Sequence, residues 1–190
     1  MKQYLAALLL ILLTGCVSVT KVETGERAVG ERLALNLKGA WNHVSVPNTG
    51  PAQTWTMEGL PVDQLLVYSG LKNDEAIHGT MVGETSKKTF VFKSGMRPDE
   101  IAGLFEGMLA RDGSSYKLTK LEPSPFGGQQ GFRFEYALTR KIDNVQLSGV
   151  GYGAVSRGEL FALVYQAPRL AFFARHAPTV EDIARSARVK

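Results

Sequence analysis

Cys16 is the only cysteine in the chain, and it lies directly after a segment that is typical of an export signal. Lys2 supplies a positive charge, and Leu5 to Leu13 form an uncharged apolar run of nine residues. A run of this length fits the apolar part of a signal peptide and is too short to span a bilayer, which requires about 20 apolar residues. Because a cysteine thiolate can form a stable thioether, the chemistry indicated at this place is the attachment of a lipid.

The tetrapeptide Leu13-Thr14-Gly15-Cys16 resembles the lipobox of bacterial lipoproteins. The resemblance implies cleavage before Cys16, a diacylglyceryl group on its thiol, and a further acyl chain such as palmitate on the new amine. Two or more chains give stable anchoring in a membrane. Val17 stands where inner-membrane lipoproteins carry aspartate, which implies the outer membrane with the domain facing the periplasm. The alternative is a soluble protein with an apolar N-terminal helix and a buried free cysteine.

The three histidines, His43, His78 and His176, are the next candidates for chemistry. They are far apart in sequence, none has HxH or HExxH spacing, and no second cysteine could complete a zinc site. A G-x-S-x-G elbow of the kind that hydrolases use is also missing from the sequence. We therefore expect dispersed surface histidines, no metal, no cofactor and no enzyme. A hydrolase whose histidines meet carboxylates only in the folded chain is the less favoured alternative.

A glycine-rich run at residues 149–154 matches the G-x-G-x-x-A pattern of dinucleotide-binding loops. That function also needs a helix to begin at the glycines, and here strand-like sequence follows. Because alternate residues of a strand share one face, Gly149, Gly151 and Gly153 should form a smooth strip. The strip predicts close packing of a helix, or a shallow groove for a partner or an apolar ligand.

Composition limits the rest of the chain to one domain of moderate charge. Removal of residues 1–15 leaves 190 − 15 = 175 residues, the size of a single domain with its own core. The net charge falls from +4 to +3 because only Lys2 is lost. The basic residues are dispersed, whereas nucleic-acid-binding proteins usually concentrate them, so no nucleic acid is expected as a partner.

The order of sequence patterns predicts a sheet followed by helices. Residues 16–32 are polar and are interpreted as the lipidated cysteine and a tether, which leaves 33–190 as the domain. A first strand inside this segment, near Val17–Val22, is the alternative. The strand-like runs are Leu33–Leu37, Trp41–Val46, Thr54–Met57, Gln64–Tyr68, Thr89–Phe92, Tyr116–Leu121, Phe132–Tyr136, Val145–Val155 and Glu159–Gln166. The last two runs are expected to form a hairpin.

Two helices are expected, at about 98–110 and about 179–188. The first begins with Pro98 and carries apolar residues at i, i+3, i+4, i+7 and i+8, which make one apolar stripe. The second is expected to begin at Thr179, whose spacing to Asp182 resembles a capping box. The predicted fold class is α+β, an antiparallel sheet with both helices packed against it.

The region from Phe132 to Val189 resembles the PsbP-like fold, which a photosystem extrinsic subunit and a Ran-binding nuclear-transport factor share. The resemblance rests on the aromatic strand after Gly131, the glycine-rich strand, Leu160–Tyr165, the Phe172-Phe173 turn and the terminal helix. These are packing patterns, so no functional residue transfers from the family. Because known members mostly act in docking or assembly, the resemblance implies a non-catalytic domain, on Cys16 as a membrane anchor, that binds another envelope protein. The alternative is a carrier or sensor of a small apolar ligand.

Overall fold

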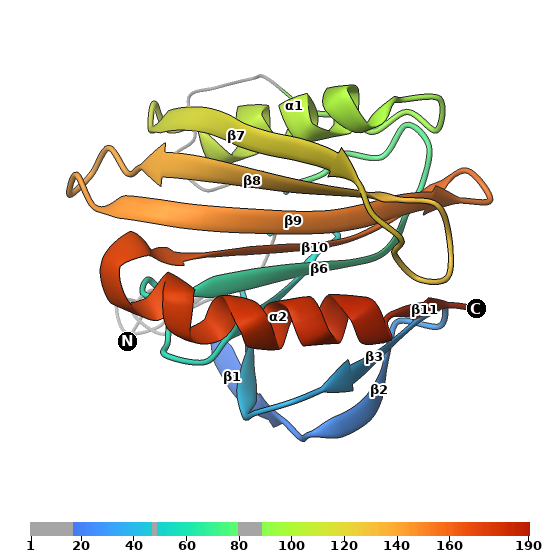
Figure 1. Ribbon diagram of the computed structural model, residues 1–190, viewed down its shortest axis with the longest axis horizontal. Coiled ribbons are helices and arrows are strands. Elements are labelled where there is room, and N and C mark those ends of the chain that lie inside the picture. Colours follow the sequence, from blue (N-terminus) through green and yellow to red (C-terminus); the bar gives the residue numbers. More distant parts are fainter. Residues whose placement is uncertain (1–16, 47–48, 80–88) are drawn as a thin grey trace, which may run out of the picture.

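The computed structural model describes residues 17–46, 49–79 and 89–190. Within these ranges the chain forms a large antiparallel sheet, a small antiparallel sheet and helices on both faces of the large one (Figure 1). The strands are β1 (Ser18–Val22), β2 (Gly25–Val29), β3 (Leu33–Leu37), β4 (Trp41–Ser45), β5 (Gln53–Thr56), β6 (Gln64–Leu71), β7 (Ser115–Pro123), β8 (Phe132–Thr139), β9 (Gln146–Ser156), β10 (Glu159–Pro168) and β11 (Arg188–Val189). The helices are α1 (Pro98–Leu109), the π-helical turn η1 (Arg169–Phe173) and α2 (Ala174–Ser186).

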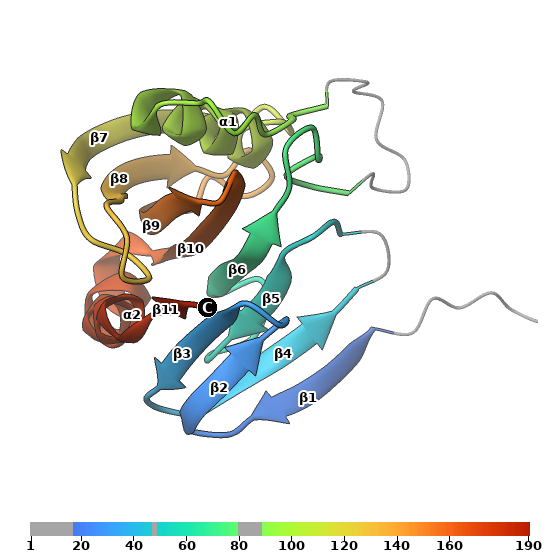
Figure 2. The same cartoon turned by 90° about the vertical axis from the view of Figure 1, so that its right-hand side faces the viewer.

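The large sheet has the strand order β1-β4-β5-β6-β10-β9-β8-β7, and every pairing in it is antiparallel. The expected hairpin is confirmed as β9 and β10, which turn through Arg157 and Gly158. The small sheet has the order β11-β3-β2. Figure 2 shows the large sheet curving from β7, beside α1, to β1 at its opposite edge. The predicted α+β class is confirmed.

Each face of the large sheet buries its own apolar core. Helix α1 covers one face, where Phe105 stacks on Phe134 of β8 with 5.5 Å between the ring centroids. Helix α2 and the small sheet cover the other face, where Trp41 and Tyr165 meet edge to face. The predicted amphipathic helix is confirmed as α1. The sequence could place it because its apolar stripe is regular and Pro98 lies at its first position.

The predicted tether is wrong for residues 18–29. β1 pairs with β4 from Ser18↔Ser45 to Val22↔Trp41, and β2 pairs with β3 from Gly25↔Leu37 to Val29↔Leu33. Both strands lie at sheet edges, where main-chain hydrogen bonds can hold residues whose side chains remain in solvent. The alternative of a strand near Val17–Val22 agrees with β1, whereas β2 was not expected.

The predicted C-terminal helix at 179–188 is displaced in the structure. Helix α2 begins at Ala174 and continues directly from η1, so Thr179 lies inside the helix and cannot cap it. Pro178 lies inside this helix, where it has no N–H to donate to the preceding turn. The helix ends at Ser186 because Ala187 is extended and Arg188 pairs with Ala34 of β3.

Two other expectations concern short segments. Thr89–Phe92 was expected to be a strand, but it contributes a single bridge between Val91 and Ala76, with Phe92 fully buried. The expected signal peptide and the lipobox-like sequence with Cys16 lie outside the described residues. Among the residues that the structure describes, no helix is long and apolar enough to cross a bilayer.

Candidate binding groove

The glycine strip is filled by aromatic rings and leaves no groove. Gly149, Gly151 and Gly153 of β9 pair directly with Tyr136, Phe134 and Phe132 of β8. A Cβ atom at Gly149 would lie 2.0 Å from the Tyr136 ring, and one at Gly151 would lie 2.1 Å from the Phe134 ring. The interpretation of this strip as a partner or ligand face is therefore wrong. The rings fold over the glycines and carry the α1 layer above them.

The three histidines do not form a common site. His176 is buried, not on the surface as expected, and its Nε2 lies 2.7 Å from Glu58 Oε1. His78 is half-buried beside the guanidinium of Arg111. His43 is half-buried in β4, where it pairs with Thr20 of β1 and Trp55 of β5. Across the described ranges, no group of three or more His, Cys, Asp or Glu side chains is arranged to hold a metal ion.

A recess with several apolar side chains in its lining lies on the α1 face, beside α1 and over β5 and β6. It is a cavity of about 350 Å³ whose floor includes Thr54, Leu66 and Tyr68. Met108 and Leu109, at the end of α1, line it together with Ile77 and His78. Among the described residues, α1 packs on Tyr68 of β6 through Phe105, whereas Leu66 of the same strand is only half-buried beside the recess.

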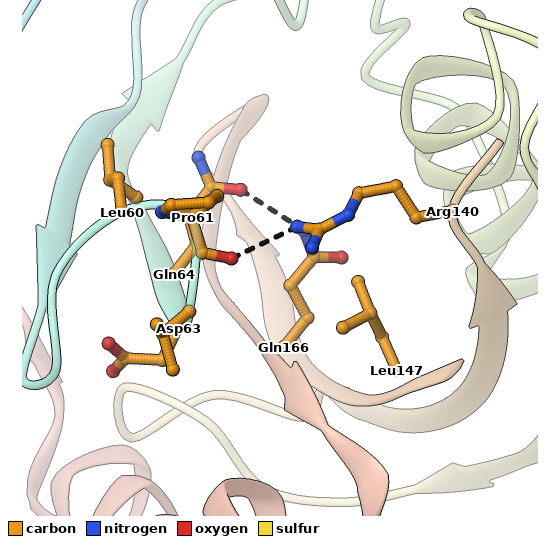
Figure 3. A pocket seen from close by; sticks show the side chains of 8 residues that line it. Leu60, Pro61, Asp63, Gln64, Arg140, Leu147 and Gln166 are labelled. Atoms are coloured by element: carbon orange, nitrogen blue, oxygen red, sulfur yellow. Dashed lines mark hydrogen bonds between the residues drawn. The ribbon is translucent and has the colours of Figure 1, made fainter. Parts of the chain in front are cut away.

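A second cavity, of about 220 Å³, adjoins the first at the end of the sheet (Figure 3). It is lined by the β5–β6 connection, including Leu60 and Pro61, and by Arg140 and Leu147 from the other side. Gln64 and Gln166 line both cavities. We therefore treat the two cavities as one feature, the binding groove, with these two glutamines at its centre.

A row of hydrogen bonds across four strands forms the centre of the groove. Gln64, Gln166, Gly149 and Tyr136 are successive partners along the sheet. The Tyr136 hydroxyl donates to Gln166 Oε1 at 3.2 Å, and Gln166 Nε2 donates to Gln64 Oε1 at 3.3 Å. The tyrosine can reach past β9 because Gly149 has no side chain. The sequence-predicted glycine thus supports the groove from below and does not line it.

The tyrosine hydroxyls around this row stay protonated. Burial raises the pKa of Tyr136 well above its ordinary value, so its hydroxyl remains a neutral donor. Burial likewise raises the pKa of Tyr68 on the groove floor. A neutral floor with fixed amides and hydroxyls suits recognition by hydrogen bonds more than proton transfer, which needs a pKa near the working pH.

Hydrogen bonds of two charged side chains, Arg140 and Asp63, hold the groove wall at the end of the sheet. Arg140 donates to the carbonyl of Pro61 at 3.0 Å and pairs through two nitrogens with Asp143, which raises the pKa of the guanidinium. Asp63 is buried, accepts from the backbone N–H groups of Met57 and Glu58, and accepts from the Thr56 hydroxyl. These bonds fix the β5–β6 connection without help from an apolar core.

Gln64, Gln166, Arg140 and Asp63 were not predicted as site residues. Each is a polar residue near the end of a strand, where such residues are common and usually exposed. Only the strand register brings the glutamines together, because they are 102 positions apart in sequence. No spacing rule along the chain could have connected them.

Comparison with known proteins gives the fold. No family model matches the chain, and no curated protein matches it in sequence. The solution structure of cyanobacterial PsbP (CyanoP) from Synechocystis sp. PCC 6803 superposes with a TM-score of 0.58, at 15% identity over 93% of this chain and 95% of that one. The chain has the PsbP-like fold.

A second solved structure is also similar over most of the chain. LpqN, described as involved in cell envelope biogenesis of Mycobacterium tuberculosis, gives a TM-score of 0.48 at 14% identity, covering 92% of this chain and 91% of LpqN. The expected resemblance to the PsbP-like fold is confirmed by the cyanobacterial structure. At these identities the similarity extends to the architecture and to no functional residue of the PsbP-like domain.

Proposed function

We propose that the protein is a lipid-anchored envelope protein whose PsbP-like domain binds another envelope protein and catalyses no reaction. The binding groove carries the proposal. It combines apolar walls from Leu66, Met108 and Leu109 with the two central amides of Gln64 and Gln166. Amide side chains can donate to and accept from a peptide backbone, so this combination suits an extended segment of a partner protein.

The start of the fold supports anchoring close to the bilayer. Cys16, the proposed lipid attachment site, is separated from the first residue of β1 by Val17 alone. Since β1 is paired with β4 along its whole length, the domain would have almost no free chain between lipid and sheet. We propose that it is held at the surface of the outer membrane on the periplasmic side, where a partner in the same membrane meets it at high effective concentration.

Photocrosslinking in cells tests the docking role. A photoreactive residue at Leu109, in the groove wall, should crosslink to one envelope protein, and one at the exposed Lys117 on β7 should not. A matched pair of charge substitutions gives the second readout. Leu66→Glu, in the groove, should abolish co-purification of that protein, whereas Leu118→Glu, on β7, should leave it unchanged. Equal loss in both variants, or equal crosslinking from both positions, would refute docking at the groove.

A small apolar ligand is the second candidate, and the larger cavity favours it. Its volume of about 350 Å³ lies within the range of about 300–1,000 Å³ typical of ligand pockets. Native mass spectrometry after gentle extraction separates the two functions. A bound species of small mass that Leu66→Glu removes would indicate a carrier, and an empty domain that still co-purifies with its protein partner would indicate docking.

A further inference from the structure

Three aliphatic side chains project into solvent at one end of the large sheet. Leu60 is 42% exposed, Ile142 is 86% exposed and Leu170 is 91% exposed. They come from three separate segments, the β5–β6 connection, the β8–β9 connection and η1, which all lie where β6 and β9 begin and β8 and β10 end. The last two segments are visible together at the left-hand end of the sheet in Figure 1. We refer to Leu60, Ile142 and Leu170 as the tip patch.

The tip patch is held in place by the fold. Arg140 bonds to both Asp143 and the carbonyl of Pro61, so it connects the segment that carries Ile142 to the segment that carries Leu60. The β8–β9 turn is closed by the bonds from Asn144 N–H to the Arg140 carbonyl and from Val145 N–H to Asp143 Oδ1. Pro168, directly before η1, is paired with Leu147 near the start of β9. The three side chains therefore project from braced backbone.

A basic residue directly precedes two of the three tip-patch residues in the sequence. Lys141 precedes Ile142, and Arg169 precedes Leu170, and both cations are exposed. The nearby acids Asp143 and Glu58 are already engaged, by Arg140 and by Arg175 with His176 respectively. Among the described residues, Lys141 and Arg169 form no ion pair. The end of the sheet thus presents apolar side chains together with two exposed cations, of which Lys141 lies over Gly113 beside Asp112.

We propose that the tip patch is a membrane-contact surface, which inserts Leu60, Ile142 and Leu170 into an anionic bilayer while Lys141 and Arg169 bind its headgroups. Charge complementarity selects this occupant, because basic residues beside apolar ones are the pattern that favours binding at an anionic membrane interface. A protein partner would need a flat or complementary surface of about 1,000 Å² or more. Three separate projecting side chains provide little such area for a protein partner, whereas the lipids of a fluid bilayer can surround each side chain. This contact would fix the orientation of the anchored domain.

Fluorescence of labelled cysteines tests the contact. The full mature protein, with Ile142→Cys or Leu170→Cys, is labelled with an environment-sensitive dye and placed on vesicles of phosphatidylethanolamine and phosphatidylglycerol. Lys117→Cys, exposed on β7, is the matched control. We expect a blue shift at both tip positions and quenching by spin-labelled lipid that is about twofold or more stronger than at the control. The double variant Lys141→Gln, Arg169→Gln should reduce this difference on the same vesicles.

Two results would overturn the proposal. One is that the dyes at residues 142 and 170 remain as accessible to water as the dye at residue 117. The other is that they become shielded only when envelope protein is added, which would make the patch a protein-docking surface. An absence of lipid on Cys16 would be seen separately, as dye on Cys16 and protein that does not sediment with the vesicles. Failure of the anchor and failure of the tip patch are therefore distinguishable.

Discussion

Substitution of Gly149 by alanine should destabilise the domain, because the space above this glycine is already occupied. The new Cβ would lie 2.0 Å from Tyr136 Cζ and 2.4 Å from both Cε atoms of the ring. The ring cannot move aside freely, since it stacks on Tyr116 at 4.9 Å and on Phe134 at 6.0 Å between centroids. Overpacking of this kind costs about 1–3 kcal/mol, which exceeds the gain of about 0.5–1 kcal/mol from replacing glycine within a strand. From the middle of both ranges we expect a net loss of about 1 kcal/mol in the free energy of unfolding.

Urea unfolding followed by tryptophan fluorescence measures this effect. With a slope of about 2 kcal/mol per molar urea, the midpoint should fall by about 0.5 M. Gly103 of α1 is the matched control, because a Cβ there has no heavy atom within 4 Å. Gly103→Ala should raise the free energy of unfolding by about 1 kcal/mol through helix propensity. If Gly149→Ala were as stable as the parent protein, the rings would not fill the strip, and a ligand groove over the glycines would again be tenable.

Two further substitutions and one titration test other contacts of the fold. Gly107→Ala should lose the helix-propensity gain of Gly103→Ala, because its Cβ would lie 2.1 Å from the Phe90 ring; equal midpoints would refute the contact. Asp63→Ala should lower the free energy of unfolding by about 3 kcal/mol in the same assay, since two backbone N–H groups lose their acceptor, while the exposed Glu106→Ala changes it by less than about 0.5 kcal/mol. Alkaline titration should show tyrosinate absorbance rising together with unfolding, because burial raises the pKa of every tyrosine after Cys16. These phenols stay neutral in the folded state and ionise near pH 10 in the unfolded state, so stability is complete below about pH 10 and falls as the pH rises further; gradual ionisation of folded protein near pH 10 would contradict this. The tyrosines are Tyr68, Tyr116, Tyr136, Tyr152 and Tyr165.

The elements that the sequence could locate are those that bury a regular apolar pattern. Helix α1 and the β9–β10 hairpin are examples, because their apolar residues recur at the helical or strand period over many positions. β1 was only an alternative to the tether and β2 was missed, because edge strands leave most of their side chains at least partly exposed and depend on main-chain pairing. The start of α2 was misplaced because Thr179 has the local chemistry of a cap, whereas the preceding π-helical turn had already set the direction of the helix.

The groove could not be predicted from the sequence, because it depends on how the strands pair. Gly149 was recognised as unusual from its spacing, but its role depends on a row of strand partners that extends from Tyr136 to Gln64. Such a row is set by register and curvature, which are tertiary properties. The tip patch is similar, because Ile142 and Leu170 look like ordinary loop residues until the fold brings their segments to one end of the sheet.

Anchoring through Cys16 underlies both the docking role and the membrane contact, and the mass of the N-terminal peptide tests it most directly. Protein is purified from the membranes of its native host, digested and examined by mass spectrometry. We predict a chain that begins at Cys16 and carries a diacylglyceryl group on the thiol and an acyl chain on the amine. Retention of residues 1–15, or an unmodified Cys16, would contradict the proposed anchor.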